Sequence, residues 1–143
     1  MYTRRVGEML DAERASLFLV DRRSGELELR VSQDLEPGVT VRIPAGTGIA
    51  GAAATSGRVV NVADAYRDPR FNRDVDLKTG FRTRSVLCLP LHDRAGAVFA
   101  VTQLLNRRDG APFDSNDEAR YAEFAGSLGI LLESLVEMGD RPS

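Results

Sequence analysis

Apolar and polar residues follow a strand pattern in the first part of the chain. Residues 15–20 form an apolar run of strand length, and residues 26–32 alternate strictly between polar and apolar side chains. Between them, residues 21–25 read Asp-Arg-Arg-Ser-Gly, a composition typical of turns. The two segments therefore predict a β-hairpin, and the strict alternation indicates that one face of the second strand is covered.

Four more apolar segments predict short strands, and two of them are joined by a turn at residues 93–96. Strands that are connected directly by turns form antiparallel sheets, so we expect an α+β fold. Residues 63–82 form a polar connection, and loops of this length in a single domain are usually functional or disordered. The four segments are residues 40–43, 58–62, 85–91 and 97–105.

Helical spacing of apolar residues occurs near both ends of the chain and once in the middle. The spacing over residues 2–13 predicts a short amphipathic helix. The Ala-rich residues 46–56 predict a second helix, which Gly57 ends. A third helix is expected over residues 115–138, leading to a linker.

The last of these helices has clear sequence signals at its start. Ser115 and Glu118 form a capping box, and Asp117 lies in the first turn, where the helix dipole favours a negative charge. Apolar residues follow at spacings of three and four, which is typical of a coiled-coil seam. We expect a homodimer through the terminal helices, and the alternative is that this face packs within one domain. The seam residues are Tyr121, Phe124, Leu128, Leu131, Leu135 and Met138.

Composition excludes several classes of protein. The 143 residues are 43% hydrophobic and 28% charged, which predicts one folded domain rather than disorder. A net charge of −2 offers no basic surface for nucleic acid. No segment approaches the roughly 20 apolar residues that span a bilayer, and no signal peptide is evident. We therefore expect a cytoplasmic protein, cut from a longer one because both ends lack natural boundaries.

The chain contains one cysteine and one histidine. A single cysteine excludes an internal disulfide framework and a thiolate metal cluster, and it fits a reducing compartment. Cys88 lies in an apolar strand and is expected to be a core residue, whereas His92 is expected in a turn, with haem ligation as the alternative. We find no nucleophile with a base and no paired carboxylates, and we expect no enzymatic activity, no metal and no cofactor.

A glycine motif and a polar loop are the candidates for ligand binding. Residues 46–51 match GxGxxG, but the neighbouring strands lack the crossover helices of a dinucleotide-binding fold. More generally, a Gly-rich helix N-terminus offers free amides to a phosphate. Residues 64–83 carry polar side chains for a small ligand, and the alternative is a solvated loop with local turns. These side chains are Asn72, Asp76, Thr79 and Thr83.

Several segments and one spaced signature resemble a known family. The segments are residues 16–21, 43–44, 48–51, 64–66 and 71–84. The signature, Asn-Lys followed by Phe and then Asp-Glu, is present with one conservative change as Asn106, Arg107, Phe113, Asp117 and Glu118. On these residues the chain resembles a GAF domain, closest to the cyclic-nucleotide-binding branch that regulates phosphodiesterases and adenylyl cyclases.

The resemblance implies the fold and the place of a site. It implies a single domain over residues 1–143 with an antiparallel sheet of about six strands. Terminal helices would cover one face of this sheet, and a ligand pocket would lie on the other face, under the helix at residues 48–56 and closed by residues 64–83. In the signature, an ion pair between Arg107 and Asp117 would support the pocket, with Phe113 packed beneath it.

The resemblance also implies which residues contact a ligand. Ser16 and Gln103 would face the base from the sheet, and the backbone of Ile49 and Ala50 would meet the phosphate. The loop residues named above would contact phosphate, ribose or purine. At Ser32 and Gln33 the family often has an aromatic residue and an acid, so Gln33 is a candidate base contact that departs from the family pattern.

Together these features imply a regulatory sensor domain that binds cAMP or cGMP and relays the signal allosterically to an output domain. One alternative is a ligand-free GAF module for dimerisation and signal relay. Another is a GAF sensor for a different ligand, such as haem or a small metabolite.

Overall fold

The computed structural model describes residues 12–32, 41–73, 76–77 and 80–139. Most of the predicted helix over residues 2–13 lies outside these ranges, and its last two residues belong to the first strand instead. The elements are β1 (Ala12–Val20), β2 (Leu27–Ser32), β3 (Arg42–Ile43), α2 (Gly48–Ser56), β4 (Val60–Val62), η1 (Ala65–Arg67), β5 (Val86–His92), β6 (Val98–Arg107) and α4 (Ser115–Gly139).

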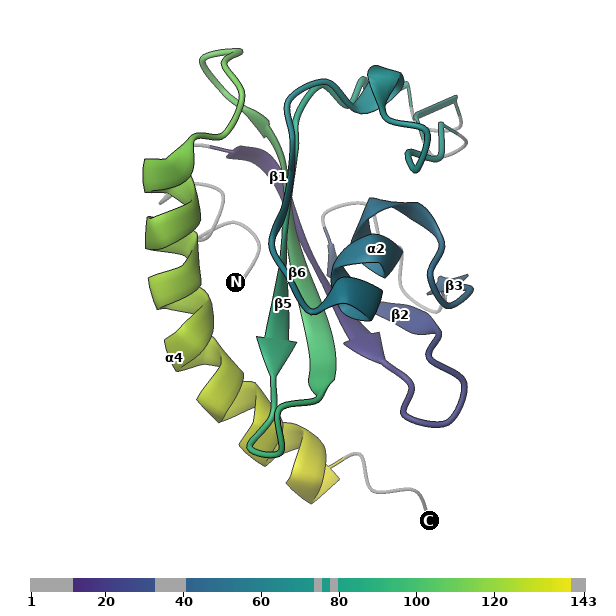
Figure 1. Cartoon of the computed structure of the whole chain (residues 1–143), viewed down its shortest axis with the longest axis vertical. Coiled ribbons are helices and arrows are strands. Elements are labelled where there is room, and N and C mark those ends of the chain that lie inside the picture. The colour runs from purple at the N-terminus through teal and green to yellow at the C-terminus, as the bar shows by residue number, and fades with distance from the viewer. Residues whose placement is uncertain (1–11, 33–40, 74–75, 78–79, 140–143) are drawn as a thin grey trace.

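The strands form one six-stranded sheet in the order β3-β2-β1-β6-β5-β4, and all neighbours are antiparallel. The two predicted hairpins, β1–β2 and β5–β6, are confirmed, and pairing of β1 with β6 joins them in the centre of the sheet. In Figure 1, α4 runs along one face of the sheet and α2 lies on the other. The predicted α+β architecture is therefore confirmed for the described residues.

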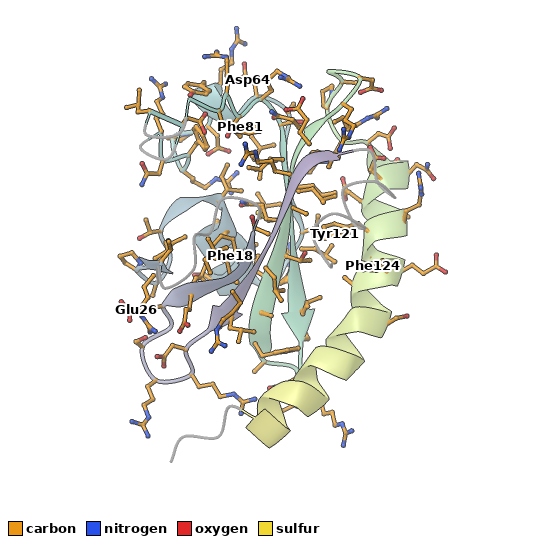
Figure 2. All side chains as sticks on the ribbon, turned by 180° about the vertical axis from the view of Figure 1, so that it is seen from behind. Phe18, Glu26, Asp64, Phe81, Tyr121 and Phe124 are labelled. Carbon is orange, nitrogen blue, oxygen red and sulfur yellow. The ribbon has the colours of Figure 1, made fainter. Side chains whose placement is uncertain are left out.

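Alternation along the strands divides the core into two clusters. On β1, Leu17 joins the cluster under α4, and Phe18 joins the cluster under α2. Figure 2 shows Phe18 and Tyr121 on opposite sides of the sheet. The α4 cluster contains Ala12, Ala15, Leu17, Leu87, Leu89, Leu91, Phe99, Ala100, Leu104, Phe113, Tyr121 and Ala125. The α2 cluster contains Phe18, Leu27, Ile49, Ala50, Ala53, Val62, Ala65, Val86, Cys88 and Val101.

The end of α2 and the start of α4 are each fixed by identifiable capping residues. Gly57 ends α2 in the left-handed region, with φ of 69°, as its sequence position predicts. At the start of α4 the capping box is shifted by one residue from the predicted pair. The Asp114 Oδ1 accepts a hydrogen bond from the Asp117 N–H at 2.8 Å, and the Asp117 Oδ2 accepts one from the Asp114 N–H at 2.8 Å.

The shift of the capping box has a local cause. Two carboxylates accept these amide hydrogens, and a carboxylate is a stronger acceptor than the Ser115 hydroxyl. The prediction that Ser115 and Glu118 form the box was therefore wrong. Glu118 instead accepts a hydrogen bond from Asn61 at 2.8 Å, which ties β4 to α4.

The first residues of the predicted coiled-coil seam pack inside the domain. Tyr121 is fully buried, and Phe124 packs against the α4 cluster. The side chains of the later seam residues, Leu128, Leu131, Leu135 and Met138, lie outside the described part of the structure. Dimerisation therefore stays a prediction. Among the described helices, none is long and apolar enough to cross a membrane.

Candidate functional site

A row of three polar side chains crosses the centre of the sheet on the α2 face. Gln103 on β6 pairs with Ser16 on β1 and with Cys88 on β5, so the three residues lie side by side. Ser16 and Cys88 are buried, and Gln103 is half-buried. This places the two predicted base contacts, Ser16 and Gln103, next to each other on the α2 face of the sheet.

Cys88 fixes the carboxamide of Gln103. The thiol donates a hydrogen bond to the Gln103 Oε1 at 3.2 Å, which leaves the Nε2 amino group on the other side of the carboxamide. Burial raises the pKa of the Cys88 thiol, and the Arg70 charge opposes this only in part, so the thiol keeps its proton and remains a donor. The prediction that Cys88 is a core residue is confirmed. Cys88 also orients the side chain of Gln103.

The N-terminus of α2 lies on the same face of the sheet, because Ile49 and Ala50 belong to the same buried cluster as Cys88. The N-cap residue Thr47 makes no side-chain capping hydrogen bond, and the first turn contains no acidic residue. Ile49 and Ala50, the predicted phosphate contacts, are buried here. The first amides of a helix have no acceptor within the helix and carry a partial positive charge. This end of α2 therefore favours an anion.

The glycines of the GxGxxG match have a backbone explanation. Gly46 and Gly48 have φ of 71° and 74°, in the left-handed region. A Cβ at Gly51 would lie 2.8 Å from the carbonyl carbon of Gly46, which only glycine avoids. The motif thus forms a tight entry to α2, and the antiparallel sheet excludes the parallel dinucleotide-binding fold.

Tyr66 organises the segment that follows β4, which Figure 1 places on the α2 side near one end of the sheet. The guanidinium groups of Arg73 and Arg82 lie 4.9 Å and 4.4 Å from the centre of its ring. The ring of Phe71 is 5.2 Å away, and the Tyr66 hydroxyl donates to the Asp76 Oδ2 at 2.7 Å. The segment is therefore held by its own side chains rather than simply solvated.

Two predicted ligand contacts in this segment bind each other. Asp76 and Thr83 are 7% and 2% exposed. Thr83 donates its backbone N–H to the Asp76 Oδ2 and its hydroxyl to the Asp76 Oδ1, each at 2.8 Å. Asn72 is exposed, and Thr79 and Gln33 lie outside the described residues. Among the described residues, no buried side-chain nitrogen or oxygen lacks a hydrogen-bond partner.

Arg70 is a functional candidate that sequence reasoning missed. Its Nε and Nη2 donate to the two carboxylate oxygens of Asp68 at 2.9 Å and 2.6 Å. This hydrogen bonding lowers the pKa of Asp68. The Arg70 carbonyl lies 3.9 Å from the position of a Cβ at Gly48, and its charge reaches Cys88. The Arg70 backbone thus lies beside the start of α2 while its guanidinium is paired with Asp68, and no short sequence pattern signals this contact.

Phe81 connects the segment to the central strand. The guanidinium of Arg14, on β1, lies 4.3 Å from the centre of the Phe81 ring. In Figure 2, Phe81 and Asp64 lie at one end of the molecule, beyond Phe18 and α2. The described part of the segment therefore contacts β1 at Arg14, two residues before Ser16.

The signature residue Asn106 anchors the end of this segment. It is fully buried with φ of 56°, a conformation that asparagine tolerates better than most residues. Its Oδ1 accepts the N–H groups of Arg84 and Ser85 at 2.6 Å and 3.1 Å. Its Nδ2 donates to the Glu13 carboxylate at 3.1 Å and to the Arg82 carbonyl at 2.9 Å.

The predicted ion pair of the signature is confirmed. Arg107 Nη1 lies 3.2 Å from the Asp117 Oδ2, and the same guanidinium also contacts Asp109 and Asp114. Phe113 is 4% exposed and belongs to the α4 cluster. The signature therefore fixes the loop between β6 and α4 and contributes no group to the polar row. No cluster of metal-ligating side chains occurs in the described part of the chain.

Comparisons with known proteins agree on one family. The family model described as GAF domain matches residues 2–132. A Drosophila melanogaster protein, dual 3',5'-cyclic-AMP and -GMP phosphodiesterase 11, is 38% identical over 90% of this chain, which spans only 10% of that relative's length.

Solved structures share the fold. The GAF domain of a phosphoenolpyruvate-protein phosphotransferase from Coxiella burnetii has a TM-score of 0.83 at 24% identity, covering 98% of this chain and 83% of that one. The free methionine-R-sulfoxide reductase of Neisseria meningitidis, solved with its substrate, has a TM-score of 0.70 at 29% identity, covering 95% of this chain and 74% of that one.

Proposed function

The chain belongs to the GAF domain family, and on that premise we propose that it is a sensor domain that binds a cyclic purine nucleotide, cAMP or cGMP. The observation that carries the proposal is that one face of the sheet holds both a polar row, Ser16 and Gln103, and a helix, α2, whose N-terminus has no side-chain cap. The similarity to a dual-specificity cyclic-nucleotide phosphodiesterase supports the choice of ligand class.

Each part of a cyclic nucleotide has a matching group in this arrangement. The cyclic phosphate is an anion, and it suits the first backbone amides of α2, those of Ile49 and Ala50, which have no side-chain cap. The purine edge carries hydrogen-bond acceptors, which suit the Nε2 amino group that Cys88 leaves available on Gln103. In this proposal the segment around Tyr66 and Asp76, which contacts β1 through Phe81 and Arg14, forms the rim of the site.

A thermal-shift titration tests the proposal. A ligand at 100 times its dissociation constant adds about 2.7 kcal/mol to stability, which is easily detected. We expect stabilisation by cAMP or cGMP, with 5'-AMP as the matched ligand control. Gln103→Leu is the protein control, because it removes the amide and leaves an apolar side chain of similar volume. The absence of stabilisation by both nucleotides at millimolar concentration contradicts the proposal.

Two further functions complete the proposal. Binding would shift the terminal helix and so bias an output domain, and two copies of the domain would pair through that helix. The seam spacing from Tyr121 to Met138 supports pairing, since its later members continue the apolar pattern. Sedimentation velocity of the wild type and of Leu131→Asp tests this point, and a monomer at all concentrations in the wild type contradicts it.

A ligand-free relay module is the main alternative. It is favoured by one observation: Asp76 and Thr83 already satisfy each other, and so do the other buried polar side chains of the described residues. This alternative predicts the dimer without any nucleotide response. The same titration therefore separates the two functions.

Sulfoxide reductase activity fits the residues poorly, although the Neisseria meningitidis reductase shares the fold. Reduction of a sulfoxide by thiols oxidises two thiols to a disulfide, and a reactive thiol needs exposure and a low pKa. Cys88 is the single cysteine among the 143 residues, it is fully buried, and burial raises its pKa. These residues are better suited to binding than to redox catalysis.

A further inference from the structure

Two hydroxyl groups meet in the apolar core between α4 and the sheet. Tyr121 on α4 and Thr102 on β6 are both fully buried, and their hydroxyl groups share a hydrogen bond. The surrounding residues, such as Leu17, Leu89 and Leu104, are apolar. A buried hydroxyl is costly without a partner, so this pair fixes the position of Tyr121 against β6 more specifically than apolar contact does.

The pair continues to the central strand. The Thr102 Oγ1 lies 3.4 Å from the Ser16 carbonyl oxygen and donates to it. Either hydroxyl can be the donor in the bond between Tyr121 and Thr102. The two contacts together link α4 through β6 to β1. Figure 2 shows Tyr121 on the side of α4 that faces the sheet.

The same short stretch of strand serves both faces. Thr102 directly precedes Gln103, so the two side chains leave β6 on opposite sides. Ser16 pairs with Gln103 and contributes its side chain to the polar row on the α2 face. The backbone of Ser16 carries the carbonyl that accepts from Thr102, and the backbone of Gln103 is joined directly to Thr102. A movement of Ser16 or Gln103 therefore displaces a group that contacts the hydroxyl pair.

We propose that Tyr121 and Thr102 couple the α2 face to the position of α4. This inference rests on the proposed function, because the nucleotide is the natural cause of a movement at Ser16 and Gln103. A ligand shifts α4 only as far as it binds the two positions of the helix with different affinity. Tyr121 is a positioning residue here: it lies behind the sheet and touches no ligand.

The test uses variants that remove the hydroxyl groups and keep the packing. Removing one hydroxyl leaves the other buried without its hydrogen-bond partner, which lowers stability. Replacing both hydroxyl groups by apolar groups of the same shape changes stability very little. We therefore combine Tyr121→Phe with Thr102→Val in one double variant. Leu91→Val is the matched control, because Leu91 is a buried residue of the same cluster outside the hydroxyl pair.

The measurement is hydrogen exchange of the α4 amides over residues 115–125, with and without saturating cAMP or cGMP. In the wild type we expect the nucleotide to change this exchange by about fivefold or more, the lower range of coupling between two sites. The double variant keeps nucleotide binding, measured by calorimetry, and loses most of the α4 response. Leu91→Val keeps both. A full α4 response in the double variant overturns the coupling.

Failure of the proposed function gives a different result. If calorimetry detects no binding of either nucleotide, the Gln103→Leu substitution takes the place of the ligand as a disturbance of the α2 face. We then expect this substitution to change α4 exchange in the wild-type background and not in the double variant. An equal change in both backgrounds overturns the coupling independently of any ligand.

Discussion

The two faces of the sheet are built in different ways. The α4 face is packed with large apolar side chains, including Leu87, Leu104 and Phe113, and is interrupted by the Thr102–Tyr121 pair. The α2 face is covered by small residues of the helix, such as Ala50 and Ala53, over a row that contains polar groups. One face thus resembles an ordinary core, and the other resembles the floor of a binding site.

The difference indicates how stability and binding are divided. Large apolar side chains contribute most of the free energy of burial, and the α4 cluster contains more of them among its buried residues, so we expect the α4 face to carry more of the stability. Small side chains and polar groups bury less apolar area, and the α2 face compensates with hydrogen bonds at its rim, such as those to Asp76.

The largest expected effect comes from a matched pair of substitutions on β6. Leu104 and Val101 are both fully buried, on the α4 and α2 faces respectively. Leu104→Ala is expected to lower the free energy of unfolding by about 2–5 kcal/mol in urea titrations. Val101→Ala is expected to cost less, about 1.6 kcal/mol from its two methyl groups before any cavity cost.

Nucleotide affinity should fall more in Val101→Ala than in Leu104→Ala, which is the reverse of the order expected for stability. Calorimetry on the folded variants is expected to give near wild-type affinity for Leu104→Ala, and weaker affinity for Val101→Ala because it loosens the contact under α2. A larger loss of affinity in Leu104→Ala contradicts the division between the two faces.

The rim of the α2 face should depend on Asp76. This carboxylate accepts hydrogen bonds from the Tyr66 hydroxyl and from the backbone and hydroxyl of Thr83. Asp76→Ala is expected to lower stability by about 1–3 kcal/mol, because it leaves buried donors without an acceptor. Hydrogen exchange should rise in residues 64–84 and stay unchanged in α4. Asp76→Asn is the control, since it keeps one acceptor oxygen, and it should have a smaller effect.

The start of α4 offers a smaller test of the same division. Asp114→Ala should lower the urea midpoint more than Ser115→Ala, because Asp114 and not Ser115 accepts the Asp117 amide. This hydrogen bond also lowers the pKa of Asp114. The hydrogen bond therefore stabilises the folded protein fully at pH values above the ordinary carboxylate pKa. This stabilisation is lost as the pH falls through the lowered pKa of Asp114 in the folded protein. Equal midpoints for the two variants at neutral pH contradict the observed cap.

Local patterns were sufficient to predict most of the fold. The alternation of β2, the turn before it and the glycine that ends α2 depend on residues close in the sequence, and all three are confirmed. The capping box was misplaced by one residue because Asp114 and Ser115 are both good N-cap residues. Spacing alone cannot choose between neighbouring candidates of this kind.

Contacts between distant residues could not be predicted from local pattern. Asn106 bonds with Glu13, 93 positions away, and Asn61 bonds with Glu118, 57 positions away. The resemblance to GAF domains placed Asn106 and Asp76 in a motif or a site without giving their partners. The bidentate contact of Arg70 with Asp68 carries no sequence signal, because charged pairs at this spacing are common in exposed loops.

The smallest expected effect concerns the pH dependence of the rim. The hydrogen bond to Asp76 raises the pKa of Tyr66 above its ordinary value of 10.0. Because the pKa is raised in the folded state, the stabilisation is fully present below pH about 10 and is lost as pH rises through the folded value. Urea midpoints of the wild type and of Tyr66→Phe should therefore converge as pH rises above about 10. Tyr121 is present in both proteins, so its own titration cancels in the difference. A difference that stays constant across this range would mean that the Tyr66 hydroxyl does not stabilise the rim through Asp76.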